Sequence, residues 1–197
     1  MLWRIHGDGH GAAAFRDTGA EIKRVDPRMY GNEGRFDCQA GEYGYLYAAE
    51  TKASTIVEAF LRGQVVRDAT ARFLRRARLT ERVLSRVRLT TELPLVDLRG
   101  AAGLGRVGQD AWLSACDEED YPITQQWAAA LRRWAPGAAG LAWMSKRDNL
   151  QEVVVLLSDR IPAGAITAQV ERRLDSPLGV SLMQKVLAEF NVTLGGS

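Results

Sequence analysis

Segments typical of β-strands alternate with segments typical of α-helices along the whole chain, and no segment repeats another. Hydrophobic residues recur with period two over 80–91, so the odd-numbered residues from Val83 to Leu89 share one face of a predicted strand. Apolar residues at helical spacing predict a helix over 124–134, which Pro136 and Gly137 end. This mixture predicts an α/β or α+β fold with a substantial sheet.

The other predicted elements follow from the same periodicities and from turn residues. Further strands are expected at 2–6, 43–49, 95–98, 140–144 and 153–157. Further helices are expected at 52–62, where Thr51 can serve as the N-cap, and at 181–190. Three segments keep two interpretations each: 69–78 as a short helix or an extended arm, 100–103 as a loop or a short helix, and 168–174 as a strand or a short helix.

Composition sets broad limits on the class of protein. The 197 residues suffice for one sizeable core, and no Pro-, Gly- or Ser-rich linker divides them. A net charge of +2 is too small to indicate nucleic-acid binding by charge alone. No apolar run reaches the roughly 18 residues that a membrane span needs, and no secretory leader precedes the first strand. We therefore expect a cytoplasmic protein in which Cys38 and Cys116 are free thiols.

Residues 31–62 combine features of a ligand site. Arg35 follows Gly34 in a glycine-containing turn, where backbone can approach an anion and a guanidinium can bind it bidentately. Tyr45 and Tyr47 lie on one face of the strand that follows. Glu58 stands in the otherwise apolar stretch 56–61, so packing can leave its carboxylate partly desolvated.

A second polar cluster, 143–148, lies between two predicted strands. Ser145 is a candidate there, because a strand end fixes a side chain while the loop keeps it accessible. Its hydroxyl could hydrogen-bond a sugar or an amide, and nothing adjacent resembles the base that a nucleophilic serine requires. The alternative is that Ser145 only begins a polar turn.

Each of the other candidates also has a purely structural interpretation. Arg35 could pair with Glu33 or Asp37 in a solvated turn. The two tyrosines could be core aromatics, and Glu58 could face solvent on its helix. The arginines between 62 and 88 fit a solvated face or a surface for a protein partner better than a site for nucleic-acid phosphates.

Several short motifs together carry a family resemblance, including the eleven-residue step from Tyr47 to Glu58. These motifs are Trp3-Arg4-Ile5, Gly34-Arg35-Phe36-Asp37, Tyr45-Leu46-Tyr47-Ala48, Ala53 through Glu58, Leu95-Val96-Asp97-Leu98, Tyr121-Pro122-Ile123-Thr124-Gln125 and Trp143-Met144-Ser145-Lys146-Arg147. In their order and spacing the chain resembles the RES-domain family, named after arginine, glutamate and serine and best known as toxins of bacterial toxin–antitoxin pairs. The resemblance implies one RES-like domain over 1–197, with a central split or mixed β-sheet and flanking helices, similar to the ADP-ribosyltransferases.

The resemblance also implies a substrate and roles for particular residues. The substrate would be NAD, whose nicotinamide–ribose bond is cleaved with water, inorganic phosphate or a protein as acceptor. Arg4 and Arg35 match arginines expected around its phosphates and ribose, although Arg4 could also be a surface arginine at a strand start. Tyr47, with Tyr45 beside it, would face the nicotinamide or ribose. Glu58 would stabilise the positive charge that develops on ribose, and Ser145 matches the serine.

Two departures from the family pattern and one protein partner complete the expectations. Phe36 and Asp37 stand where tryptophan and asparagine are common in the family, and Asp37 adds a negative charge beside the expected phosphate site. No metal is required, because His6 and His10 lack partners at ligand spacing. An Xre-like antitoxin is the implied protein partner. The alternatives are a protein ADP-ribosyltransferase and a non-catalytic module that binds NAD, ADP-ribose or a protein.

Overall fold

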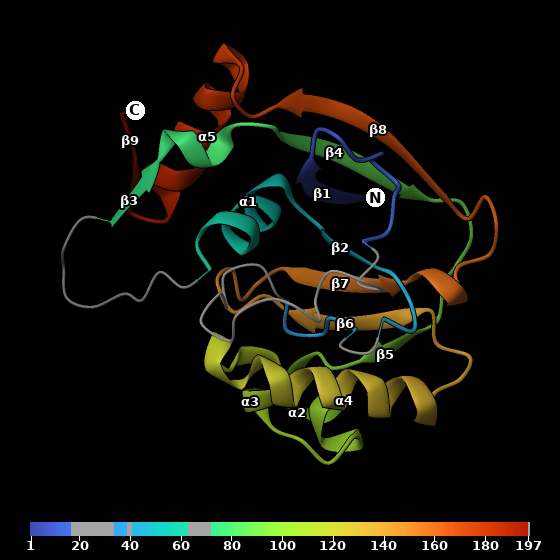
Figure 1. Ribbon diagram of the computed structural model, residues 1–197. Helices are drawn as coiled ribbons and strands as arrows, with labels where there is room; N and C mark the ends of the chain where they lie inside the picture. The colour runs from blue at the N-terminus through green and yellow to red at the C-terminus, as the bar shows by residue number, and fades with distance from the viewer. Residues whose placement is uncertain (17–33, 39–40, 63–71, 197) are drawn as a thin grey trace.

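A computed structural model describes residues 1–16, 34–38, 41–62 and 72–196, and its main feature is a curved seven-stranded sheet (Figure 1). The strand order across the sheet is β5-β6-β7-β2-β1-β4-β8. The strands are β1 (Leu2–Gly7), β2 (Tyr45–Ala49), β4 (Arg82–Leu89), β5 (Leu95–Asp97), β6 (Gly140–Met144), β7 (Glu152–Leu157) and β8 (Ile166–Arg173). Only β5 and β6 are parallel, and the other neighbours are antiparallel. The sheet is therefore mixed, and the α/β prediction is confirmed.

Helices gather at two ends of this sheet. The helices are α1 (Lys52–Phe60), α2 (Gly100–Arg106), α3 (Ala111–Ala115), α4 (Tyr121–Trp134) and α5 (Pro177–Glu189), with short 3-10 turns η2 (Arg76–Leu79), η3 (Glu118–Asp120) and η4 (Ser158–Arg160). In Figure 1, α2, α3 and α4 lie together beside β5 and β6, whereas α1 lies near β1 and β2. A separate parallel pair, β3 (Arg72–Arg75) and β9 (Val192–Gly195), accompanies α5.

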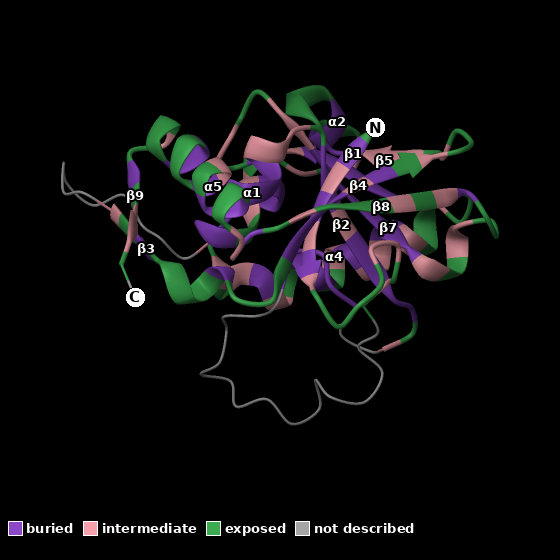
Figure 2. Cartoon of the chain, turned by 90° about the horizontal axis from the view of Figure 1, so that it is seen from above, coloured by how far each residue is buried: buried purple, intermediate pink, exposed green. Residues whose placement is uncertain are grey.

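The two faces of the sheet carry different side chains, because successive residues of a strand point to opposite sides. On β2, Tyr45 and Ala49 join a core that includes Leu131 of α4, whereas Leu46 and Ala48 join a separate core. We call the first side the helix face and the second the opposite face. Figure 2 shows the buried residues concentrated in the central strands and in the inward sides of the helices.

The first strand follows the same alternation. Trp3 lies across from Ala49 and packs with Ile5 against the core formed by α1 and α5, so both are on the helix face. Leu2 joins the core of the opposite face. Arg4 is two residues from Leu2 and is therefore on the opposite face as well.

Most predicted elements are present, and two of the three ambiguous segments become strands. Residues 168–173 belong to β8, and residues 72–75 form β3 before the 3-10 turn η2. Residues 100–103 begin α2. Thr51 caps α1, since its hydroxyl accepts a bond from the Ser54 amide at 3.0 Å. The predicted turn residues 31–33 and the start of the 69–78 segment lie outside the described residues.

Two helices begin earlier than the periodicity predicts, and two short elements were missed. Helix α4 begins at Tyr121 and α5 at Pro177, each with a proline in the first turn, where the missing amide hydrogen costs nothing. Helix α3 has five residues and β9 has four, too few for a periodic signal. In the described part of the chain, no helix is long and apolar enough to cross a membrane.

Candidate active site around Glu58

Glu58 is held by the loop that follows β6. Its carboxylate oxygen Oε1 accepts a hydrogen bond from the Ser145 hydroxyl at 2.5 Å, and Oε2 lies 3.5 Å from Nη1 of Arg147. The Glu58 side chain remains 21% exposed. The structure therefore leaves part of this carboxylate accessible while both of its oxygens have a defined neighbour.

Ser145 is almost completely buried, and its hydroxyl group both donates and accepts hydrogen bonds. It is 1% exposed, and its Oγ accepts hydrogen bonds from the backbone amides of Arg147 (3.1 Å) and Asp148 (2.9 Å). A hydroxyl has one proton, and here that proton goes to Glu58. This arrangement orients the glutamate and does not activate the serine as a nucleophile.

The same loop is attached to α1 at a second point. The Ser54 hydroxyl donates to Oδ2 of Asp148 at 2.7 Å. Ser54 and Glu58 are four residues apart, so they lie one above the other on the same side of α1. The two residues therefore face the loop together.

Arg35 is buried against the connection between α3 and α4. It is 5% exposed, its Nη1 donates to the Cys116 sulfur at 2.7 Å, and its Nη2 donates to the Cys116 carbonyl at 3.1 Å. Its guanidinium lies over the ring of Tyr121, 5.0 Å from the centroid. Burial raises the pKa of the Cys116 thiol, which keeps it protonated at neutral pH. The alternative pairing of Arg35 with Asp37 is not the one observed.

The turn that carries Arg35 is fixed from two sides. Thr124 donates its hydroxyl to the Arg35 carbonyl at 2.6 Å, and the Gln125 side-chain amide donates to the Gly34 carbonyl at 2.9 Å. From β2, the Tyr47 hydroxyl accepts from the Phe36 amide at 2.9 Å. The first turns of α4 thus position the arginine, a role that periodicity alone did not indicate.

Asp37 and Tyr45 support this turn from inside the protein. Asp37 is 2% exposed, and its Oδ2 accepts from the Gly34 amide at 2.7 Å and from the Tyr45 hydroxyl at 2.6 Å. Burial, and next the negative charge of Asp37, raise the pKa of Tyr47 well above its usual value. The carboxylate that was expected beside a phosphate site is therefore a structural part of the turn.

Comparisons with known proteins identify the family and the fold. The family model described as the RES domain matches residues 1–177. This chain belongs to the RES-domain family. A search of curated proteins returned no match. Among solved structures, the chain is similar to a chain of the crystal structure of the M. tuberculosis MbcT–MbcA toxin–antitoxin complex, with a TM-score of 0.59 and 15% identity over 95% of this chain and 88% of that chain. At that identity the likeness concerns the fold.

Within this RES domain, four of the six predicted site residues lie in one connected region of the helix face. Glu58 and Ser145 are bonded directly, and Tyr47 holds the turn of Arg35. Tyr45 packs edge-on against Tyr47, with ring centroids 5.7 Å apart, but it is 2% exposed and its hydroxyl is bonded to Asp37. Tyr45 is therefore a buried packing neighbour of Tyr47.

Arg4, another predicted site residue, lies apart from this region. It lies on the opposite face of the sheet, 8% exposed, with its Nη1 donating to the Ala12 carbonyl at 3.0 Å. Burial lowers its pKa to about 10. Beside it on the same strand, His6 bonds the Ser85 hydroxyl through Nε2 at 2.8 Å. This polar group is separated from Glu58 by the sheet itself.

Arg62 is the residue that the sequence did not single out. Its guanidinium lies 6.0 Å from the centroid of the Tyr121 ring, so Tyr121 has both Arg35 and Arg62 as cationic neighbours. Burial acts to lower the Arg62 pKa, but nearby acidic groups, which include Tyr47 and Glu58, outweigh it and raise that pKa. Arg62 lies in the turn just after the C-cap of α1, so helical periodicity did not point to it.

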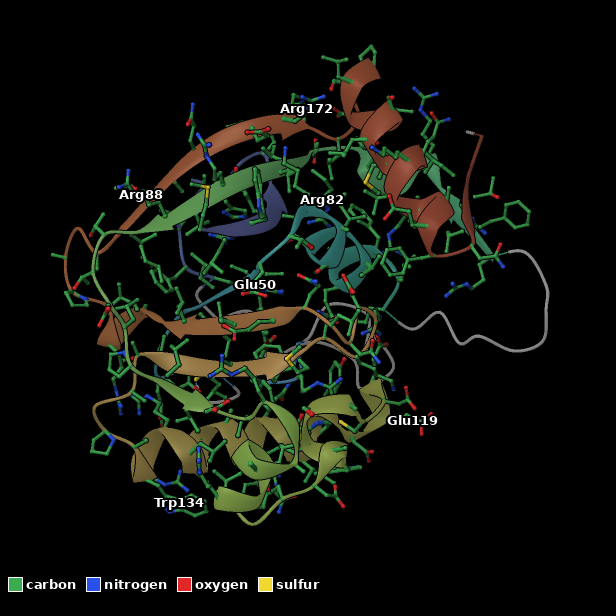
Figure 3. All side chains as sticks on the ribbon, turned by 180° about the vertical axis from the view of Figure 1, so that it is seen from behind. Glu50, Arg82, Arg88, Glu119, Trp134 and Arg172 are labelled. Atoms are coloured by element: carbon green, nitrogen blue, oxygen red, sulfur yellow. The ribbon has the colours of Figure 1, made fainter. Side chains whose placement is uncertain are left out.

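The remaining polar candidates do not form a site. Among residues 1–16, 34–38, 41–62 and 72–196, no group of three His, Cys, Asp or Glu side chains is placed to hold a metal ion. Cys38 and Cys116 are buried free thiols, as predicted. From the arginine-rich stretch, Arg82 and Arg88 are exposed near opposite ends of β4 (Figure 3).

Proposed function

We propose that this protein cleaves the nicotinamide–ribose bond of NAD and is the toxin of a bacterial toxin–antitoxin pair. One observation carries the enzymatic part: a partly exposed glutamate, Glu58, whose carboxylate is oriented by a buried serine at 2.5 Å. Membership of the RES-domain family supports it. Arg35, Arg62 and Tyr47 lie in the same region of the helix face and supply the groups that a dinucleotide requires.

The chemistry of the reaction explains why an oriented carboxylate matters. When the glycosidic bond breaks, nicotinamide leaves with the electron pair and the ribose becomes oxocarbenium-like. A fixed carboxylate stabilises this positive charge mainly in the transition state, which is what accelerates a reaction. Glu58 supplies the charge, and Ser145 holds its direction through one hydrogen bond.

Two guanidinium groups would anchor the diphosphate away from the reacting bond. Arg35 uses its two terminal nitrogens on Cys116, and the five N–H donors of a guanidinium allow a phosphate oxygen to be bound as well. Arg62 is the second guanidinium beside the Tyr121 ring, and in this proposal it has the role that the resemblance implied for Arg4. Such anchoring positions the sugar for cleavage. Tyr47 would face the nicotinamide or ribose.

The decisive experiment follows nicotinamide release from NAD by the purified protein, with and without inorganic phosphate. We expect release in at least one condition and a loss of at least about a hundredfold in Glu58→Gln, which keeps the shape and removes the charge. Glu92→Gln, at an exposed carboxylate, serves as the matched control and should retain full activity. No release by folded wild-type protein in either condition would refute the enzymatic proposal.

The same assay separates the possible acceptors. Free ADP-ribose identifies water as the acceptor, and ADP-ribose 1″-phosphate identifies phosphate. Transfer of label from NAD to a polypeptide identifies a protein ADP-ribosyltransferase. Thermal stabilisation by NAD without nicotinamide release identifies a binding module.

The toxin assignment rests on the family and on the fold shared with a chain of a toxin–antitoxin complex. We propose an Xre-like antitoxin as the protein partner. Expression of the wild-type chain should arrest bacterial growth, whereas Glu58→Gln should not. Equal arrest by both proteins would show that toxicity does not depend on the proposed chemistry.

A further inference from the structure

We propose that Ser54 and Asp148 are positioning residues that hold the Glu58 carboxylate in its working orientation. The kinetic test of this inference rests on the proposed function, whereas its stability test rests on geometry alone. Two of the hydrogen bonds between helix α1 and the loop after β6 join a serine to a carboxylate. Ser145 of the loop donates to Glu58 of the helix at 2.5 Å, and Ser54 of the helix donates to Asp148 of the loop at 2.7 Å.

The direction of the second bond follows from counting protons. The Thr51 and Ser54 hydroxyl oxygens are 2.6 Å apart, and Thr51 Oγ1 also accepts from the Ser54 amide. Asp148 as a carboxylate can only accept, so the Ser54 proton goes to it and the Thr51 proton goes to Ser54. The chain of donors therefore runs from the N-cap of α1 to the loop.

Asp148 is also tied to Ser145 within the loop. Its backbone amide donates to the Ser145 hydroxyl oxygen at 2.9 Å, and its carbonyl accepts from the Gln151 amide at 2.9 Å. Ser54 is 0% exposed and Ser145 is 1% exposed, so the serine hydroxyls of these bonds are buried, whereas the carboxylates of Asp148 and Glu58 are partly exposed. The helix and the loop are closed into a ring by Ser54, Asp148, Ser145 and Glu58.

Two attachment points constrain the loop more than one. With only the contacts of Ser145 and Arg147 to Glu58, the loop could pivot about that carboxylate and turn it away from the sugar. The bond between Ser54 and Asp148, one helical turn before Glu58, opposes this rotation. Catalytic groups need such support, because a small misplacement removes much of their effect.

The kinetic test uses three variants with a matched control. Asp148→Ala and Ser54→Ala should each lower kcat for nicotinamide release at least tenfold while the KM for NAD stays within about twofold. Asp148→Asn should retain most of the rate, since its amide oxygen can still accept from Ser54. Asp117→Ala removes an exposed aspartate that contacts Lys146 of the same loop, and it should change neither constant.

Particular outcomes would overturn the proposal. An unchanged kcat in Asp148→Ala, or an Asn variant as slow as the Ala variant, excludes positioning by this hydrogen bond. If Asp148→Ala fails to fold, Ser54→Ala gives the same decision, because a buried serine replaced by alanine loses little packing volume. A rise in KM with kcat unchanged would show that the pair serves binding alone.

A second measurement does not depend on turnover. If Asp148 acts on Glu58 through the ring, the melting-temperature losses of Asp148→Ala and Glu58→Ala, which both remove the acceptor, should be less than additive in the double variant. Additive losses would overturn the inference even if the enzyme is active. If wild-type protein releases no nicotinamide, the proposed function fails, and this cycle alone decides whether the two residues are coupled.

Discussion

Two buried arginines that the family resemblance pairs around one ligand lie on opposite faces of the sheet. Arg35 lies on the helix face, where Tyr121, Tyr47 and the turn at Gly34 surround it. Arg4 lies on the opposite face and donates to the carbonyl of Ala12. Both are less than a tenth exposed, so burial does not distinguish them.

The two buried guanidinium groups differ in the side chains that surround them. Near Arg35 are a partly exposed carboxylate, a second guanidinium and aromatic rings, the groups on which the proposed function rests. Near Arg4 are His6 and Ser85, whose polar atoms satisfy one another inside the protein. A backbone step of one residue would have moved Arg4 to the other face.

Glycine substitutions give the largest expected contrast between the two regions. A Cβ on Gly34 would lie 2.4 Å from Oδ1 of Asp37 and 2.6 Å from the Tyr47 hydroxyl, both of which are held in place. Gly34→Ala should lower the free energy of unfolding by about 3 kcal/mol. Gly7→Ala, at the end of β1, meets only His10 at 3.4 Å and should be tolerated. Chemical denaturation measures both, and equal losses would contradict the contrast.

Serine substitutions compare the two faces of the sheet by their effect on kcat. Ser145→Ala removes the donor to Glu58 and leaves buried amides without their acceptor, at a cost of about 1–3 kcal/mol. We expect kcat for nicotinamide release to fall about tenfold to a hundredfold. Ser85→Ala removes an equally buried hydroxyl on the opposite face and should lower stability with kcat unchanged. A lower kcat in Ser85→Ala would contradict this prediction, because it would show that the opposite face also affects turnover.

Lysine substitutions test the two arginines directly. Arg35→Lys replaces a planar fork by a point charge and should raise the KM for NAD about tenfold. Arg4→Lys should leave KM unchanged, since its guanidinium lies on the other side of the sheet. Steady-state kinetics over a range of NAD concentrations decides the matter. A raised KM in Arg4→Lys would contradict this prediction and show that Arg4 takes part in NAD binding.

The smallest expected effect is a pH dependence of stability from the opposite face. Burial lowers the pKa of His6 below 6.5, so folding disfavours its protonated form. Its contribution is therefore fully present above the unfolded pKa near 6.5 and is lost as the pH falls, by at most about 1.4 kcal/mol per pH unit. Unfolding at pH 7 and pH 5 should show a smaller loss for His6→Gln than for the wild type. Equal losses would exclude His6 as the cause.

Periodicity identified most elements because their residues obey local rules. Helix α1 shows this: Thr51 caps it, and its apolar positions face the core. Strand β9 could not be identified in this way, since its four residues form a strand only by pairing with β3 more than a hundred residues earlier. The early starts of α4 and α5 were missed for a different reason, because their first turns contain a proline and little apolar signal.

For the site, the sequence determined which residue types are available and tertiary structure decided which of them meet. The spacing of Tyr47 and Glu58 and the loop position of Ser145 can be read directly, and these residues do lie together. The placement of Arg4 on the opposite face, the position of Arg62 beside Tyr121 and the hydrogen bonds of buried Asp37 depend on strand parity and on contacts between distant segments. Local pattern carries no information about these contacts, because the sheet order and the packing of helices against it are set by the whole chain.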